Sequence, residues 1–141
     1  SKNMNAELST SKLHDIAHMG MRATIGVIFI VHGFGKFGNP GFGDWISSMG
    51  IPAEMQIPIA LAEFVPGILL LIGVLTRISG ALLSIVMLGA IFLVKGATSL
   101  TGDSGYEFDL ILLAASLVVV VSGPGRISIS YLIKKIPRVL Q

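Results

Sequence analysis

Residues 55–94 read MQIPIALAEFVPGILLLIGVLTRISGALLSIVMLGAIFLV. Two apolar runs, 55–75 and 78–94, lie on either side of Thr76-Arg77, and Glu63 and Arg77 are the only charged residues in the whole stretch. A helix needs about 20 apolar residues to cross a hydrocarbon layer about 30 Å thick. The two runs therefore predict two transmembrane helices, which a tight turn at Thr76-Arg77 makes antiparallel neighbours.

Two further apolar segments, 17–37 and 106–121, complete a set of four predicted spans. Hydrophobic residues make up 52% of the 141 residues, charged residues make up 13%, and the mean hydropathy is +0.82. A soluble chain this short has too little interior to bury so much apolar surface. We predict an all-α fold, an integral membrane four-helix bundle with short interfacial segments, formed by residues 1–141 as one domain in a lipid bilayer.

The segments outside the four spans have their own patterns. Residues 38–45 are rich in turn formers and carry Phe42 and Trp45, which favours a short helix at the membrane interface. Residues 127–140 form a basic amphipathic tail, which suits either an anionic membrane surface or a partner subunit. The first span lacks a small-residue cleavage site, so we expect it to be retained rather than removed as a signal peptide.

Charge and cysteine content exclude several classes of function. The net charge is +2, but the basic residues are scattered instead of forming a phosphate-binding stripe, so no nucleic-acid partner is expected. The chain has no cysteine, which removes thiolate catalysis, iron–sulfur ligation and thiolate zinc sites. In the flanks of the spans, basic residues gather on one side, which predicts a multi-pass cell-membrane protein with both termini in the cytoplasm. Those residues are Lys2, Lys12, Arg77, Arg126, Lys134, Lys135 and Arg138.

Glu63 is the most informative residue, because a carboxylate inside an apolar span costs several kcal/mol unless it is paired, hydrated or protonated. Pro58 and Pro66 flank it, and Pro66 has no N–H to give to the carbonyl of Ala62. This arrangement is typical of the broken helices that line ion and transporter sites. The alternative is a structural salt bridge that fixes helix register.

The first span has a polar edge formed by His32 and Lys36, which are four residues apart, with Arg22 close to the same stripe. His32 and Glu63 are expected at similar depth, where a His–Glu pair would bind a quinone carbonyl and move its protons. These two residues are therefore the catalytic candidates. For Lys36, the alternative is a side chain that extends to the lipid headgroups.

Two acids, Glu107 and Asp109, begin the fourth span. Negative charge stabilises a helix N-terminus, so both have a structural explanation. Lys95 and Lys36 are also candidate partners for them, which predicts a ligand-binding or buried polar cluster. Its predicted members are Arg22, His32, Lys36, Glu63, Lys95, Glu107 and Asp109.

Two other motifs carry no function in this context. The pattern Gly33-x-Gly35-x-x-Gly38 matches a dinucleotide fingerprint, but it ends a transmembrane helix instead of joining a strand to a helix. His14 and His18 have the spacing of metal ligands, but no third ligand is near them in the sequence. We therefore predict no metal site.

A series of short motifs runs along the chain in a fixed order. They are Arg22, His32-Gly33-x-x-Lys36, Ala62-Glu63-x-x-x-Gly67, Leu71-x-Gly73-x-x-Thr76-Arg77, Gly105-Tyr106-Glu107 and Gly123-Pro124-Gly125-Arg126-Ile127-Ser128-Ile129. With these motifs, the chain from about residue 22 to residue 131 resembles the DoxX family of small four-helix membrane proteins, including its DoxD-like branch. The resemblance implies a membrane protein linked to redox work, similar to the membrane subunits of thiosulfate:quinone oxidoreductase, with Arg22, Lys36, Glu63 and Glu107 at the family's polar positions. Lys95 and Ser130 depart from the pattern.

Three hypotheses follow. The first is an accessory subunit of a quinone-linked or respiratory-type oxidoreductase complex, in which other membrane subunits supply any metal or flavin and a quinone is the one cofactor expected near this chain. The second is a noncatalytic structural subunit of a larger membrane complex. The third is a component of a small-molecule transporter. It is the least favoured of the three, because the chain has only four predicted spans and no inverted repeat.

Overall fold

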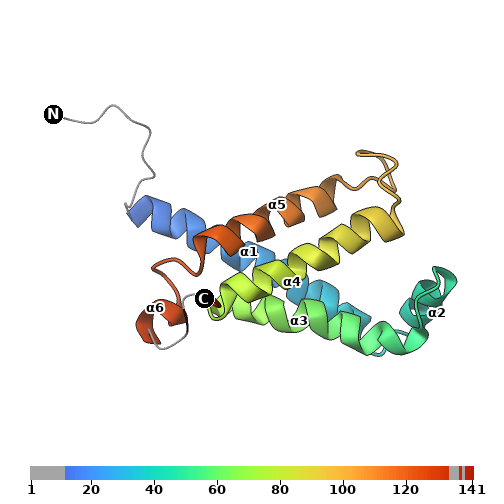
Figure 1. The fold of residues 1–141 in the computed structure, drawn as a ribbon, viewed down its shortest axis with the longest axis horizontal. Helices are drawn as coiled ribbons and strands as arrows, with labels where there is room; N and C mark the ends of the chain where they lie inside the picture. Colours follow the sequence, from blue (N-terminus) through green and yellow to red (C-terminus); the bar gives the residue numbers. More distant parts are fainter. Residues whose placement is uncertain (1–11, 134–136, 138) are drawn as a thin grey trace.

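The computed structural model describes residues 12–133, 137 and 139–141, and in this part of the chain it is all-helical, without strands. The long helices α1, α3, α4 and α5 run side by side, and the short helices α2 and α6 lie at opposite ends of the group (Figure 1). The elements are α1 (Lys12–Lys36), α2 (Pro40–Ser48), the 3-10 turn η1 (Ala53–Met55), α3 (Gln56–Ile72), α4 (Thr76–Gly89), the π-helical turn η2 (Ala90–Val94), α5 (Glu107–Ser122) and α6 (Ile129–Ile133).

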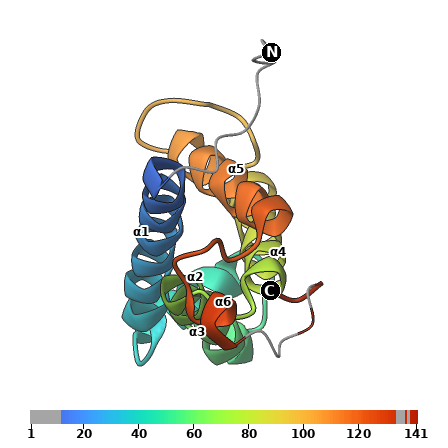
Figure 2. The same ribbon diagram turned by 90° about the vertical axis from the view of Figure 1, so that its left-hand side faces the viewer.

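Seen along its length, the molecule is a four-helix bundle in which α1, α3, α4 and α5 surround one core (Figure 2). Each of these helices packs on two of the others, in the order α1, α3, α4, α5 and back to α1. The buried core residues come from all four helices: Ile25, Phe29, Leu70, Leu83, Met87, Leu112 and Val119. We call the end that carries α2 and residues 96–106 the α2 end, and the opposite end the α6 end.

The pair α1 and α3 approaches closely because glycines face each other across the contact. A Cβ atom on Gly26 would lie 2.7 Å from the carbonyl oxygen of Gly67, and one on Gly33 would lie 2.6 Å from the backbone nitrogen of Phe64. Small residues allow membrane helices to come together in this way. The glycines therefore set the distance between the two helices that carry Lys36 and Glu63.

The connection between α3 and α4 differs from the prediction. Gly73 ends α3 in the left-handed conformation (φ 78°), and its N–H bonds to the carbonyl of Leu69. Thr76 and Arg77 therefore begin α4 instead of forming the turn, which consists of residues 73–75. Glycine adopts a positive φ without steric cost, so the chain turns at Gly73 instead of three residues later.

Within the described ranges, three helical segments are long and apolar enough to cross a membrane: Lys12–Lys36, Ala53–Ile72 and Thr76–Val94. The fourth, α5, has 16 residues and a length of about 24 Å, which is less than the hydrocarbon thickness of about 30 Å. Its sequence is apolar, and it packs in the bundle against α1 and α4. In the predicted tail, α6 covers Ile129–Ile133, and residues 134–136 and 138 lie outside the described residues.

Candidate functional site

Lys36 and Glu63 form an ion pair near the α2 end of the bundle. Lys36 is the last residue of α1, and its Nζ atom lies 2.5 Å from Oε2 of Glu63 in α3. The side chain of Glu63 is 5% exposed and that of Lys36 is 23% exposed. The ammonium also lies 5.5 Å from the centre of the Phe42 ring. Lys36 thus turns inward to the acid, which supplies the partner that a buried carboxylate requires.

A second ion pair between a lysine and a carboxylate joins the residue after η2 to α5. The Nζ atom of Lys95, which follows η2, lies 2.6 Å from Oδ2 of Asp109 in the first turn of α5. Lys95 also donates a hydrogen bond of 2.9 Å to the carbonyl of Gly105. The pair therefore ties the loop between η2 and α5 to the start of α5.

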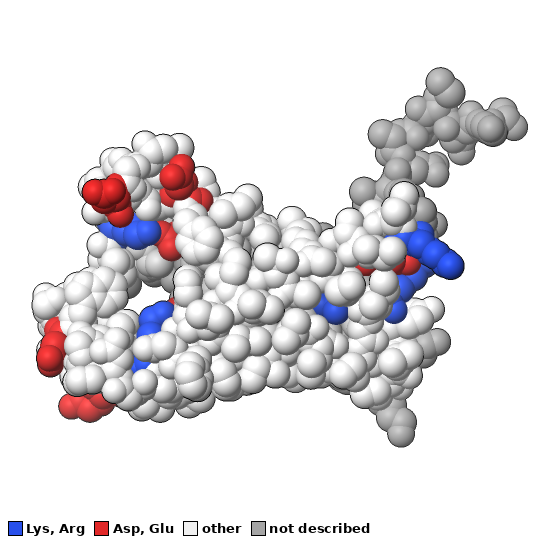
Figure 3. All heavy atoms as spheres, turned by 180° about the vertical axis from the view of Figure 1, so that it is seen from behind, with Lys and Arg blue, Asp and Glu red and all other residues white. Residues whose placement is uncertain are grey.

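Both ion pairs line one cavity of about 360 Å³. Its other lining residues are mainly apolar: Phe42, Trp45 and Ile46 of α2, Met49 and Ile51 after it, Ile59 and Ala62 of α3, and Val86, Gly89, Ala90, Leu93 and Val94. Figure 3 shows basic atoms in a hollow at this end of the molecule, between two projecting parts that carry acidic atoms. With each lysine matched by a carboxylate, the cavity has no net formal charge.

The structure places three predicted members of the polar cluster outside this cavity: Arg22, His32 and Glu107. His32 is exposed on α1, and its ring and that of Phe108 of α5 pack in a T-shaped arrangement, with ring centres 6.1 Å apart. Glu107 is exposed at the start of α5. Glu63 takes Lys36 instead of His32 as its ion-pair partner, because the last turn of α1 brings the longer lysine side chain over α3.

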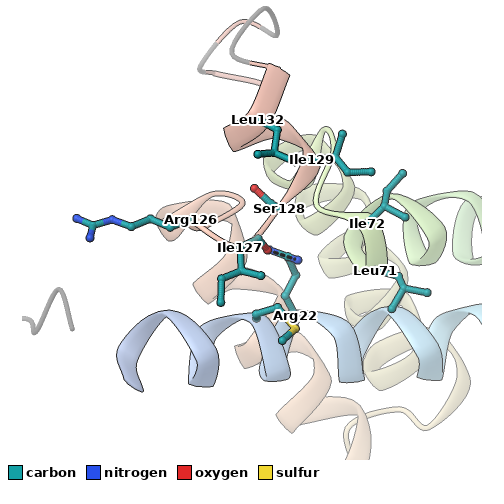
Figure 4. A pocket seen from close by; sticks show the side chains of 9 residues that line it. Arg22, Leu71, Ile72, Arg126, Ile127, Ser128, Ile129 and Leu132 are labelled. Atoms are coloured by element: carbon teal, nitrogen blue, oxygen red, sulfur yellow. Dashed lines mark hydrogen bonds between the residues drawn. The ribbon is translucent and has the colours of Figure 1, made fainter. Parts of the chain in front are cut away.

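Arg22 lies at the other end of the bundle from the cavity. It precedes Lys36 by fourteen residues in α1, a rise of about 21 Å. Its guanidinium is buried and donates to the carbonyls of Leu70 (2.8 Å), Ile127 (2.9 Å) and Pro124. Figure 4 shows Arg22 reaching from α1 to the segment that carries Ile127 and Ser128. Arg22 therefore fastens the chain after α5 to the bundle and does not belong to the predicted cluster.

The sequence did not reveal which residues form the apolar walls of the cavity. The short helix predicted around Phe42 and Trp45 is α2, and both of these side chains line the cavity with the two ion pairs. Gln56 holds this arrangement, since its side-chain nitrogen donates to the carbonyls of Lys36 (2.8 Å) and Asn39 (2.5 Å). The amphipathic pattern of residues 40–48 was the sequence feature from which a packed face of this helix could have been predicted.

His18 of α1 contacts α5 at the α6 end. Nε2 of His18 lies 2.7 Å from Oγ of Ser122 in α5. In the described part of the chain, no group of three or more His, Cys, Asp and Glu residues is arranged to hold a metal ion.

Comparison with known proteins gives one family and several relatives. The family model described as DoxX matches residues 17–96. The Bacillus subtilis protein named "Putative oxidoreductase CatD" is 36% identical over 114 residues, which cover 80% of this chain and 84% of that protein. The Escherichia coli "Inner membrane protein YqjF" is 30% identical over 130 residues, 88% of this chain and 97% of that protein. No solved structure matches the chain.

Proposed function

The chain belongs to the DoxX family of membrane proteins, and we propose that it is a membrane-embedded subunit of a quinone-linked oxidoreductase complex, in which the cavity at the α2 end holds the quinone headgroup. Electrons would come from a redox centre on a partner subunit, which the proposal therefore requires. The redox part draws support from the name of the Bacillus subtilis relative, and the quinone part draws support from the cavity itself.

The observation that carries the proposal is the pairing of Lys36 with Glu63 and of Lys95 with Asp109 in one apolar cavity. A quinone headgroup is a flat, uncharged ring with a carbonyl oxygen on each side. Ammonium groups donate hydrogen bonds to such oxygens, while aromatic and aliphatic walls accommodate the ring. The cavity volume of about 360 Å³ falls within the range of about 300–1,000 Å³ that small-molecule sites occupy.

The ion pairs also suit the proton transfers of quinone chemistry. Reduction to the quinol adds a proton to each carbonyl oxygen, and an ammonium hydrogen-bonded to that oxygen is positioned to supply it. The paired carboxylate holds the lysine side chain at the cavity wall through the ion pair. Lys36 and Lys95 are thus the proposed donors, and Glu63 and Asp109 hold them in place.

Binding of a tail-less benzoquinone tests the proposal. Trp45 is the only tryptophan of the chain and lines the cavity, so a bound quinone should quench its fluorescence with saturation. The protein is purified in lipid nanodiscs and titrated as wild type, Lys36→Met and Lys95→Met. We expect each variant to bind at least 10-fold more weakly, because a charged hydrogen bond contributes about 1.5–3 kcal/mol.

The matched control is Glu107→Gln, which removes an exposed charge at the same end of the bundle without changing the cavity lining. Its affinity should equal that of the wild type. Quenching that never saturates in the wild type, or equal affinity in all four proteins, overturns the proposal.

A second candidate function is that of a noncatalytic subunit of a larger membrane complex. The nearly complete burial of Glu63 in its ion pair favours it, since such pairs serve to fix helix register in many proteins. In that case Lys36→Met/Glu63→Met, which replaces both charges by apolar groups, should assemble normally and leave the activity of the whole complex unchanged.

We also propose that both termini face the cytoplasm. Lys12, Arg77 and Arg126 lie at the α6 end, where Arg126 lies 3.9 Å from Asp15. At the α2 end, Lys36 and Lys95 are matched by Glu63 and Asp109, and Asp44, Glu54, Asp103 and Glu107 add further negative charge. The natural chain has no cysteine, so single-cysteine variants can be labelled in intact cells with an impermeant maleimide. Ser104→Cys should react from outside and Val139→Cys only after the cells are opened. The reverse pattern contradicts this orientation.

A further inference from the structure

A second depression lies on the outside of the bundle, between α3 and α4. It has a volume of about 440 Å³, and Ser79 is the one polar side chain among the described residues that line it. Leu61, Val65 and Ile78 on its rim are 44%, 45% and 50% exposed. These helices are membrane spans, so this groove faces the hydrocarbon of the bilayer.

The groove and the cavity adjoin each other. Ala62 of α3 lines both of them. On α4, Leu82 lines the groove and Val86, one helical turn further along, lines the cavity. A molecule with its polar part between the ion pairs would therefore meet the groove at Ala62 and continue along it within the same pair of helices.

Two prolines shape the groove on the α3 side. Pro58 and Pro66 both line it, and neither has an N–H to donate to the preceding turn. Pro66 leaves the carbonyl of Ala62 without its usual helical partner at the point where groove and cavity adjoin. A hydrogen-bond acceptor at this junction suits the hydroxyl of a quinol, whereas the rest of the groove suits a hydrocarbon chain.

We propose that this groove holds the isoprenoid tail of the quinone whose headgroup occupies the cavity, an inference that rests on the proposed function. Its apolar lining, its exposure to the bilayer and its continuity with the cavity identify a tail attached to that headgroup as the occupant. Moving such a tail from lipid to protein yields no hydrophobic gain, because both surroundings are apolar. The tail contributes through packing, so its effect on affinity is about 10-fold and not several orders of magnitude.

The experiment compares two quinones with the same headgroup, one without a tail and one with a short isoprenoid tail. Quenching of Trp45 is measured in nanodiscs, and the membrane concentration of the tailed quinone is corrected with protein-free nanodiscs. Leu82→Phe and Val65→Phe fill the groove without altering the lining of the cavity. The controls are Ile85→Phe on α4 and Val118→Phe on α5, which place the same ring at lipid-facing positions outside the groove.

We expect the groove variants to bind the tailed quinone about 10-fold more weakly than the wild type, with unchanged affinity for the tail-less quinone and with both controls like the wild type. If the tail adds no affinity in the wild type, or if groove and control variants behave alike, the groove is an ordinary lipid-facing surface and the inference is wrong. If the tail-less quinone fails to bind the wild type, the headgroup proposal itself fails, and the inference fails with it.

Discussion

Lys36 and Glu63 lie 2.5 Å apart, Nζ to Oε2, and join the end of α1 to α3 at the wall of the cavity. The same pair is placed to stabilise the helix contact and to meet a ligand. Removing one partner tests both roles at once, so the two have to be separated by comparing single and double substitutions.

The first prediction concerns this separation. Glu63→Gln leaves Lys36 charged in an apolar cavity and should lower the free energy of unfolding by about 2 kcal/mol, which is less than the roughly 3–5 kcal/mol for fully buried pairs because Lys36 is 23% exposed. Lys36→Met/Glu63→Met should recover most of this loss but should not bind quinone. Unfolding in mixed detergent micelles measures the stabilities. A double variant that stays as unstable as Glu63→Gln would contradict the explanation.

The second prediction concerns the close contact of α1 with α3. Gly33→Ala should cost about 1–3 kcal/mol, because its Cβ would lie 2.6 Å from the backbone nitrogen of Phe64 and 2.8 Å from the carbonyl oxygen of Ala60. Gly35→Ala is the control, since a Cβ there has no heavy atom within 4 Å and alanine favours a helix by about 0.5–1 kcal/mol. The same unfolding assay should rank Gly35→Ala at or above the wild type. Equal losses in both variants would show that packing at Gly33 is not the cause.

The third prediction concerns Arg22. Arg22→Met removes three donors and leaves the carbonyls of Leu70, Pro124 and Ile127 without them, which should cost about 3 kcal/mol. Arg22→Lys keeps the charge but lacks the planar fork, so it should restore only part of the loss. Hydrogen exchange of residues 123–133 should rise in both variants, whereas the cavity end should keep its wild-type exchange. Unchanged exchange in 123–133 would mean that other contacts hold this segment.

The fold could be predicted from the sequence because helix length and apolar composition are matched to a membrane of known thickness. Residues 55–94 alone predicted two antiparallel helices, and α3 and α4 confirm them. The exact turn was wrong, because Gly73 ends α3 through its left-handed conformation, a local effect that apolar runs do not reveal. The length of α5 also differs from an ideal span, since Gly123 ends it after 16 residues.

The site was predictable only in part. The cost of burying a carboxylate indicated that Glu63 needs a partner. Lys36 and Lys95 were predicted as candidate partners for Glu107 and Asp109, and in the structure Lys95 pairs with Asp109 while Lys36 pairs with Glu63. Spacing on one helix gives the angle around its axis but not which neighbour lies opposite, so His32 was assigned to Glu63 although Lys36 reaches it. For the same reason, Arg22 was predicted in one cluster with Lys36, which lies about 21 Å further along the helix. The cavity wall depends on how α2 folds back, which needs the tertiary structure.

Photoaffinity labelling tests the central claim most directly, that the two Lys–carboxylate pairs and α2 enclose a quinone site. The protein in native membranes is irradiated with an azido-quinone, and the labelled peptides are mapped by mass spectrometry. We predict labels on cavity residues such as Trp45, Met49 and Leu93, which unlabelled quinone competes away and which Lys36→Met reduces at least tenfold. Labels spread over the lipid-facing sides of the four helices, unaffected by competitor or by the substitution, would contradict the account.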